Sequence, residues 1–397
     1  MIRKLVPILG ITFIDIIGFS MLLPILPYFV THFGMSAFVV GLLISTFSFC
    51  QLITGPLWGN VSDRIGRKRV LIISQIGATI GWTMLAFAPT ILWVFIARVL
   101  EGVSGGNIGI TQAYVADLVA PRERARAFGL ISATFAAGMV FGPVGGGLLY
   151  ARFGFTAPFL AAAALQLLTL ILTITLLPES RTKQEGETHV GMREIAATFT
   201  NRELSPILLQ KLALSLCLYG WYSVIALYLA GQLHFGVVAT TQYFSAFALV
   251  NVAINGFGVG KASRRLGDPR MAIVGLALLV AAFGLTPFVH HWLTVAGVML
   301  LFALGGAFAN NGITAMISNA ASEREQGTVL GVSSSLDSLS GILAPPFSTG
   351  LLSRFGSPFG GIESLVMAAV ALTLGIRNSL HASAVSANTP AEELEAV

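Results

Sequence analysis

The sequence contains few charged residues and almost no cysteine. Asp, Glu, Lys and Arg make up 10% of its 397 residues, whereas they make up about 25% of a typical soluble domain. Hydrophobic residues reach 55% and the mean hydropathy is +0.82, so an ordinary soluble fold is excluded. The two cysteines, Cys50 and Cys217, lie in apolar stretches and are too few for a disulfide framework or a cysteine-based metal site.

Groups that carry common enzyme chemistry are also scarce. The six histidines are scattered over predicted loops and tails. The sequence shows no metal-ligand cluster, phosphate-binding loop, Ser/His/Asp set or sizeable polar domain. We therefore expect neither an enzyme nor a bound metal or cofactor.

Long apolar runs are what the sequence has in abundance. Each is about 20 residues long, which is enough for a helix to cross a hydrocarbon layer of about 30 Å, and none alternates as the strands of a membrane barrel do. We predict an all-α membrane protein with twelve transmembrane helices. The predicted spans are 5–29, 37–59, 70–88, 91–116, 127–149, 156–177, 204–230, 240–260, 271–289, 292–317, 328–350 and 357–377.

Basic residues divide unequally between the two sides of this topology. The loops on one side carry nearly all of the Lys and Arg, and the other side keeps only Arg152 and Arg354. Because positively charged loops remain in the cytoplasm, we expect both termini to be cytoplasmic. The protein would be a monomeric, multi-pass component of a bacterial inner (plasma) membrane. The basic residues are spread over short turns, so the net charge of +5 does not indicate nucleic-acid binding.

The chain consists of two similar halves. A polar stretch separates six predicted spans from six, and several residues recur at a spacing of 202: Gly129 and Gly331, Pro143 and Pro345, and Gly154 and Gly356. Repeated halves suit transporters in which one helical bundle rocks against the other. The expected domains are a six-helix bundle at 1–177, a cytoplasmic linker at 178–203, a second bundle at 204–377 and a disordered cytoplasmic tail at 378–397.

Four motifs in the first half carry a more specific signal. A charged turn, GNVSDRIGRKR, occupies residues 59–69 and has a weaker copy at 260–270. The other three lie in predicted spans: DIIG and PILP at 15–27, RVLEG at 98–102, and GMVFGPVGG at 138–146. These motifs resemble those of the major facilitator superfamily, and within it the twelve-helix drug:proton antiporters for tetracycline and multidrug efflux. The resemblance implies two pseudo-symmetric six-helix bundles and proton-coupled export by alternating access.

The resemblance also implies roles for two of the motifs. Asp63 would cap a helix of the other half and Arg64 would reach Asp117, and both contacts would stabilise an outward-facing state. A solvated basic turn that only sets topology is the alternative. The latch residues are Gly59, Asp63, Arg64, Gly66, Arg67 and Asp117. The antiporter motif of the fifth span, where missing side chains allow close helix approach, comprises Gly138, Gly142, Pro143, Gly145 and Gly146.

Five ionisable residues fall inside predicted spans: Asp15, Arg98, Glu101, Lys211 and Asp337. A charge at the bilayer centre costs about 2.5–3.5 kcal/mol, so we assign proton coupling to all of them except Lys211. Arg98 and Glu101 lie three residues apart, hence on one helix face. They form either a structural ion pair or a proton site tuned by the arginine. Asp15 could instead neutralise a cationic substrate, and Lys211 could simply extend to the cytoplasmic interface.

Polar and aromatic residues of the spans define candidates for a substrate cavity. A wall with few acids suits small lipophilic or cationic molecules. The third span has Gly-Trp-Thr at 81–83 and the ninth has no acid. Tetracycline exporters carry acidic residues in both, so a metal-chelated tetracycline is disfavoured. The candidate substrate residues are Phe19, Gln51, Asn107, Gln112, Tyr222, Gln242, Asn251, Asn310 and Asn311.

Two other hypotheses remain open from the sequence. The protein could take up or facilitate diffusion of an organic anion or a sugar, with Arg98 and Lys211 as anion contacts. A receptor that transports nothing would keep the same fold, although the buried acids favour transport.

Overall fold

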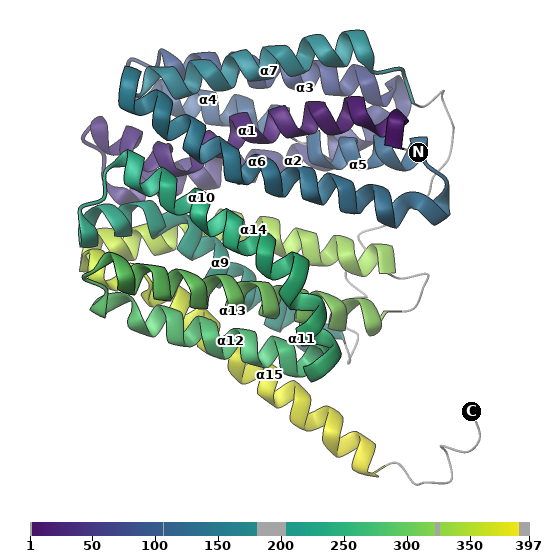
Figure 1. Cartoon of the computed structure of the whole chain (residues 1–397), viewed down its shortest axis with the longest axis vertical. Coiled ribbons are helices and arrows are strands. Elements are labelled where there is room, and N and C mark those ends of the chain that lie inside the picture. The colour runs from purple at the N-terminus through teal and green to yellow at the C-terminus, as the bar shows by residue number, and fades with distance from the viewer. Residues whose placement is uncertain (1, 106, 181–203, 322–325, 389–397) are drawn as a thin grey trace. The chain divides into compact units, whose positions relative to one another are not determined.

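The computed structural model describes residues 2–105, 107–180, 204–321 and 326–388. Within those ranges the chain is built from helices joined by short turns, and no strand occurs (Figure 1). Eleven helical stretches of the described chain are long and apolar enough to cross a membrane. The prediction of an all-α membrane protein is confirmed.

The helices of the first half follow the predicted spans closely. They begin and end within a few residues of the expected bounds because each lies between turn-forming residues. Their bounds are α1 Ile2–His32, α2 Ala37–Ile65, α3 Arg67–Ala86, α4 Ile91–Ser104, α5 Asn107–Leu118, α6 Arg124–Phe153 and α7 Thr156–Leu176, with a 3-10 turn at Pro121–Glu123.

The second half repeats this pattern. Its helices are α9 Leu204–Leu233, α10 Val237–Ala253, α11 Val259–Leu266, α12 Asp268–Leu285, α13 Trp292–Asn319, α14 Gln326–Phe355 and α15 Ile362–Asn388, with 3-10 turns at Thr286–Phe288 and Ser357–Phe359. The span predicted at 328–350 forms a helix, α14, but it is not among the eleven stretches of the described chain that are apolar enough to cross a membrane. Its run of serines around Asp337 lowers its hydropathy.

Matched turns show the internal repeat directly. Gly66 ends α2 with φ of 105°, and Gly267 ends α11 with φ of 74°. Gly154 after α6 and Gly356 after α14 have φ of 73° and 86°. A positive φ is costly for residues with a side chain, so glycine is required at the same turns of both halves.

Two predicted spans are interrupted. The span expected at 91–116 is divided into α4, which ends at Ser104, and α5, which begins at Asn107. The span expected at 240–260 contains a π-helical turn, Ile254–Gly258, between α10 and α11. Breaks inside membrane helices are tolerated where neighbouring groups satisfy the freed backbone atoms, and they often accompany functional sites.

One compact unit comprises Met1–Thr188, Tyr222–Val252 and Gly341–Gly360. In it α1 packs on α6 and α7, α3 packs on α7 and α4, and α2 packs on α4. One of its hydrophobic cores surrounds Phe29 and Phe159, and another surrounds Leu5 and Tyr114. The unit differs from the expected division of the chain because parts of α9, α10 and α14 pack with the first half.

Specific contacts attach these parts of the second half to the first. The Tyr28 hydroxyl on α1 donates to the Phe235 carbonyl oxygen at 2.8 Å and lies 2.6 Å from the Thr240 hydroxyl. The Ser45 hydroxyl on α2 donates to the Ile342 carbonyl oxygen of α14 at 2.6 Å. A Cβ at Gly147 of α6 would collide with Thr241 of α10.

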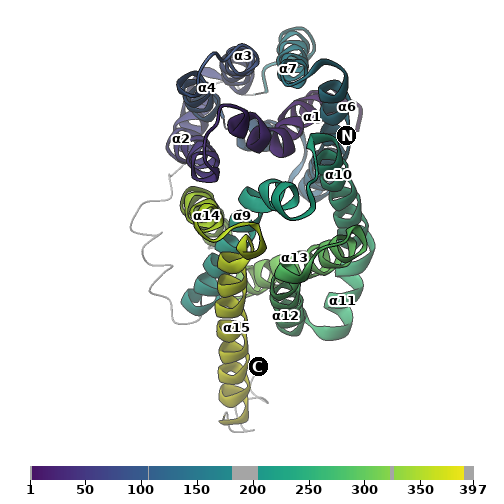
Figure 2. The same cartoon turned by 90° about the vertical axis from the view of Figure 1, so that its left-hand side faces the viewer.

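The other unit comprises His189–Trp221, Ala253–Ser340 and Gly361–Val397. Its helices α12 and α13 lie side by side in both views (Figures 1 and 2). Gly275 allows their close approach, because a Cβ at this position would collide with the α13 backbone. Trp221, Phe283 and Phe302 form an aromatic cluster with ring centroids 5.2–6.2 Å apart. Helix α15 continues to Asn388, past the end expected at 377, so the first residues of the predicted disordered tail are helical.

Candidate functional site

The guanidinium of Arg98 and the carboxylate of Glu101 form an ion pair on one face of α4. Both side chains are buried: the residues are 3% and 6% exposed. Arg98 Nε and Glu101 Oε1 make no hydrogen bond with any described residue. The structure therefore supports the pairing predicted from their spacing and places the pair in the interior of the first unit. Burying an ion pair with unsatisfied polar atoms costs free energy.

Neighbouring helices shape the pocket around this pair. The Arg98 guanidinium lies 5.5 Å from the Phe47 ring centroid on α2 and 5.8 Å from the Trp82 ring centroid on α3. A Cβ at Gly81 of α3 would collide with the Glu101 side chain. The glycine therefore makes room for the carboxylate, and the two rings cover the cation. Phe47 and Trp82 were not predicted as parts of the site, although Trp82 directly follows Gly81.

The break after α4 lies one turn beyond Glu101. The last carbonyl groups of α4 lose their intrahelical partners there, and side chains of α2 and α3 replace them. Thr54 donates to the Gly102 carbonyl oxygen at 3.2 Å, Trp58 donates to that of Val103 at 2.6 Å, and Ser74 donates to that of Ser104. These bonds hold the end of α4 in place although the helix is interrupted.

Helix α1 carries Asp15 and Phe19. Asp15 is half-buried. The Phe19 ring lies 6.3 Å from the Phe47 ring, which in turn covers Arg98. Aromatic contacts therefore connect a candidate substrate residue on α1 with the ion pair on α4.

A second ion pair joins α9 to α14 in the other unit. The Lys211 ammonium lies 3.0 Å from Asp337 Oδ1 and donates to Asn310 Oδ1 on α13 at 2.9 Å. The Ser215 hydroxyl also donates to Asp337 Oδ1, at 2.5 Å. Lys211 is 4% exposed, so the interpretation that it extends to the membrane interface is wrong. Its position two turns into α9 did not distinguish an interfacial lysine from a buried one. Only the packing of three helices brings Asp337 and Asn310 to it.

The remaining candidate substrate residues have different local surroundings. Gln51 is half-buried, and its side chain lies beside Gly105 at the α4 break. The Asn251 amide donates to the Phe247 carbonyl oxygen at 3.2 Å, and the Asn311 amide donates to Asn255 at 3.0 Å. Three residues, Gln112, Tyr222 and Gln242, are exposed, and the side chain of Asn107 lies outside the described residues.

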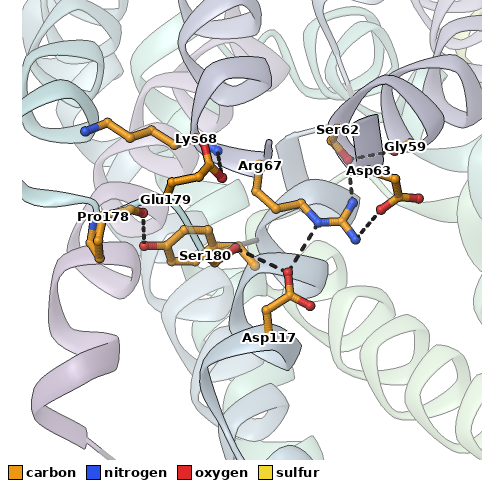
Figure 3. Close-up of polar contacts among 10 residues, drawn as sticks. Gly59, Ser62, Asp63, Arg67, Lys68, Asp117, Pro178, Glu179 and Ser180 are labelled. Carbon is orange, nitrogen blue, oxygen red and sulfur yellow. Dashed lines mark hydrogen bonds and ion pairs between the residues drawn. The ribbon is translucent and has the colours of Figure 1, made fainter. Parts of the chain in front are cut away.

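The charged turn between α2 and α3 forms the network in Figure 3. Arg67 lies 2.6 Å from Asp63 and 3.5 Å from Asp117, and it also donates to the Ser62 hydroxyl. Arg64 is exposed. The prediction that Arg64 reaches Asp117 is wrong, because Gly66 ends α2 and the new direction of α3 brings Arg67 to that carboxylate instead.

The chain after α7 joins the same network (Figure 3). The Glu179 carboxylate accepts the backbone N–H of Lys68 at 3.2 Å, and the Ser180 hydroxyl donates to Asp117 at 3.2 Å. The Tyr114 hydroxyl donates to the Pro178 carbonyl oxygen at 2.9 Å. The start of the predicted linker is thus attached to the charged turn.

The glycines of the predicted antiporter motif lie where α6 crosses α1. A Cβ at Gly138 would collide with Ile16, and a Cβ at Gly142 would collide with Ser20 and the Ile17 carbonyl oxygen. The neighbours of Gly145 and Gly146 are Met21 and Ile25 of α1. Pro143 lies inside α6 on the same buried side. The expected close approach is therefore made to the helix that carries Asp15.

Comparisons with known proteins agree with the motifs. The family model "Major Facilitator Superfamily" matches residues 8–345 and, in a second alignment, residues 243–393. The chain belongs to the Major Facilitator Superfamily. It is therefore a multi-pass membrane transporter, and the resemblance stated from its motifs is confirmed.

Its relatives by sequence include drug-resistance proteins. The chain is 31% identical to the class C tetracycline resistance protein of Escherichia coli over 93% of its own length and 95% of that protein. It is 27% identical to multidrug resistance protein 2 of Bacillus subtilis (strain 168), with 84% of each chain covered.

Solved structures confirm the fold. A bacterial homologue of the human lysosomal transporter Spinster, in an inward-facing conformation, gives a TM-score of 0.77 at 18% identity, with coverage of 95% of this chain and 96% of that one. A peptide transporter, POT, gives 0.80 at 14% identity, with coverage of 96% and 95%.

Proposed function

We propose that this protein is a proton-coupled exporter of small lipophilic or cationic molecules. It works by alternating access as a monomer in the plasma membrane, with both termini in the cytoplasm. The observation that carries the proposal is the dry Arg98–Glu101 ion pair inside a membrane helix, because buried ionisable groups in transporters commonly relay protons. The names of the relatives, tetracycline and multidrug resistance proteins, support the substrate class.

In this mechanism Glu101 takes up the proton and Arg98 balances its charge. Asp15 and Asp337 are the further acidic groups of the coupling machinery, one on α1 and one on α14. A proton entering from outside neutralises a carboxylate, and a substrate entering from inside displaces that proton. The substrate residues named from the sequence contact the transported molecule.

Uptake of an organic anion or a sugar is the weaker alternative. It needs Arg98 and Lys211 as anion contacts, yet Arg98 is paired with Glu101 and Lys211 with Asp337. An anionic substrate would have to displace a carboxylate that is already in contact.

A chelated metal is not needed for the proposed substrates, and α12 has no acid after Asp268 at its first residue.

The charged turn and the glycine motif supply the conformational change. Arg67, Asp63 and Asp117 form the ion network of the latch, which stabilises one conformational state. Gly66 lies at its turn, Gly59 accepts a hydrogen bond from Ser62, and Arg64 lies at the surface. The α1–α6 crossing keeps Asp15 on a tightly packed helix pair.

The test is transport by the purified protein in liposomes, with ethidium as a cationic lipophilic probe. An imposed pH gradient should drive ethidium against the proton flux, and collapsing the gradient with nigericin should abolish accumulation. Glu101→Gln and Asp15→Asn should each uncouple the two fluxes. Ethidium movement that is unaffected both by nigericin and by the two variants together would overturn the proposal.

A further inference from the structure

The Arg98 cation has two kinds of partner. One is the Glu101 carboxylate, and the other is a pair of aromatic faces, Phe47 on α2 and Trp82 on α3, at 5.5 Å and 5.8 Å from the guanidinium carbon. Trp82 is 5% exposed, so water does not screen its ring from the cation. Cation–π attraction is strongest in such desolvated settings.

Lys211 provides an internal comparison. Its ammonium is also buried, but its contacts are the Asp337 carboxylate and the Asn310 amide oxygen, and no ring lies over it in the described residues. The Asp337 side chain is 34% exposed, whereas the Glu101 side chain is 5% exposed. The two ion pairs therefore differ in what remains around the cation when the acid is neutralised.

Protonation of a buried acid leaves its partner cation without a counter-charge. When Glu101 takes up a proton, Arg98 loses its counter-charge while it stays in the dry interior, which is strongly unfavourable unless another group compensates. The faces of Phe47 and Trp82 remain in place and carry negative electrostatic potential. In the ion pair most of the charge is already compensated, so the rings matter most in the protonated state.

We propose that Phe47 and Trp82 form an aromatic clamp on Arg98 that makes protonation of Glu101 possible. They are positioning residues for proton coupling and act through Arg98 rather than on the proton itself. Phe47 also contacts Phe19 of α1, so movement of α1 or a substrate at Phe19 changes the clamp. The inference rests on the proposed function, because it assumes that Glu101 carries the coupled proton.

The charged residues of the two helices that pack most closely on α4 lie too far away to replace the clamp. The helices packed against α4 are α2 and α3. On α2 the nearby titratable group is the Cys50 thiol, whose side chain lies beside Gly102. The charged residues of α3, Arg67, Lys68 and Arg69, lie in its first turn, and those of α2, Asp63 and Arg64, lie near its end. Each is at least ten residues from Trp82 or Phe47 on its own helix, which corresponds to about 15 Å or more along the helix axis.

The experiment separates aromatic character from side-chain size. Trp82→Phe and Phe47→Tyr keep a ring over Arg98, whereas Trp82→Leu and Phe47→Leu keep an apolar side chain without a ring. The readout is ethidium transport in liposomes at a fixed gradient as the pH on the proton-supplying side is varied. The midpoint of this profile should move to lower pH by about one unit in the leucine variants, because a unit corresponds to about 1.4 kcal/mol, within the range of a buried cation–π contact.

Matched controls come from exposed aromatic residues of α2 and α4. Trp93→Leu on α4 and Phe49→Leu on α2 make the same substitutions at positions that are 45% and 52% exposed. Both controls, and both ring-retaining variants, should keep the wild-type midpoint. A folding defect would lower the amount of monodisperse protein and the maximal rate without moving the midpoint.

The outcomes separate this inference from the proposed function. If Glu101→Gln abolishes coupling and the leucine variants have the wild-type midpoint, the clamp is wrong and the proposed function stands. The same conclusion follows if Trp82→Phe behaves like Trp82→Leu. If Glu101→Gln leaves coupling intact, the assignment of Glu101 fails, and the clamp fails with it.

Discussion

The Lys211 ammonium lies 3.0 Å from the Asp337 carboxylate although the two residues belong to different helices, α9 and α14. The pair is asymmetric, because the lysine side chain is 5% exposed and the aspartate side chain is 34% exposed. Lys211 also holds Asn310 of α13, so one buried cation joins three helices.

Removing either charge of this pair should have unequal effects. Asp337→Asn leaves a buried ammonium without its counter-charge and should destabilise the protein by about 3–5 kcal/mol. Lys211→Met leaves a carboxylate that water can reach and should cost less. The double variant removes both charges and should recover most of the loss. Thermal unfolding of the purified protein in detergent measures all three, and equal losses in the two single variants would contradict the asymmetry.

The two arginines of the charged turn should differ in importance. Arg67→Ala removes the contacts with Asp63 and Asp117 and leaves two acids near each other, so the rate of ethidium transport should fall at least tenfold. Arg64→Ala changes an exposed residue of the same type and is the matched control, with an expected change below twofold. A larger effect at Arg64 than at Arg67 would show that the structure assigns the latch to the wrong arginine.

The crossing of α1 and α6 should tolerate no side chain at its centre. Gly142→Ala places a methyl group against Ser20 and the Ile17 carbonyl oxygen, and such overpacking costs about 1–3 kcal/mol. Gly129→Ala on the same helix is the control, because nothing lies within 4 Å of its added Cβ. The melting temperature should fall for the first variant only. A wild-type value for Gly142→Ala would mean that the helices are not in contact at that position.

Gly66 should be the least replaceable of the turn glycines. It has φ of +105°, and an added Cβ would also collide with the Glu179 carboxylate that accepts the Lys68 N–H. Gly267, at the matched turn of the other half, also has a positive φ with an extended ψ but has open space around it, so Gly267→Ala introduces backbone strain without the collision. Thermal unfolding should show a clearly larger loss for Gly66→Ala than for Gly267→Ala. Similar losses would mean that Glu179 does not press on the turn.

Local patterns predicted most of the fold and part of the site. The apolar runs predicted the helices, and three-residue spacing predicted the contact between Arg98 and Glu101, since both features depend on neighbours along the chain. The partner of Asp117 was predicted wrongly, as Arg64 instead of Arg67. The turn at Gly66 redirects the chain between those two arginines, and sequence spacing contains no information on that direction.

The missed residues have a common cause. Phe47 and Trp82 belong to helices with many apolar residues, and nothing in their own segments distinguishes them from residues that face lipid. Their role depends on the rotation of α2 and α3 about their axes relative to α4. Lys211 was misinterpreted for the same reason, because its partner lies more than a hundred residues away in the sequence, and three other predicted spans separate the two helices.

By itself the sequence determined a membrane protein with helical spans, glycine turns at matched places in two repeated halves, and acids and bases inside the apolar runs. Hydrophobicity and backbone freedom act locally, so the chain encodes these features segment by segment. Only the tertiary structure decided which charges meet, which rings cover Arg98 and which glycines lie at a helix crossing. Those contacts depend on how helices rotate and cross, and that is set by the packing of many side chains at once.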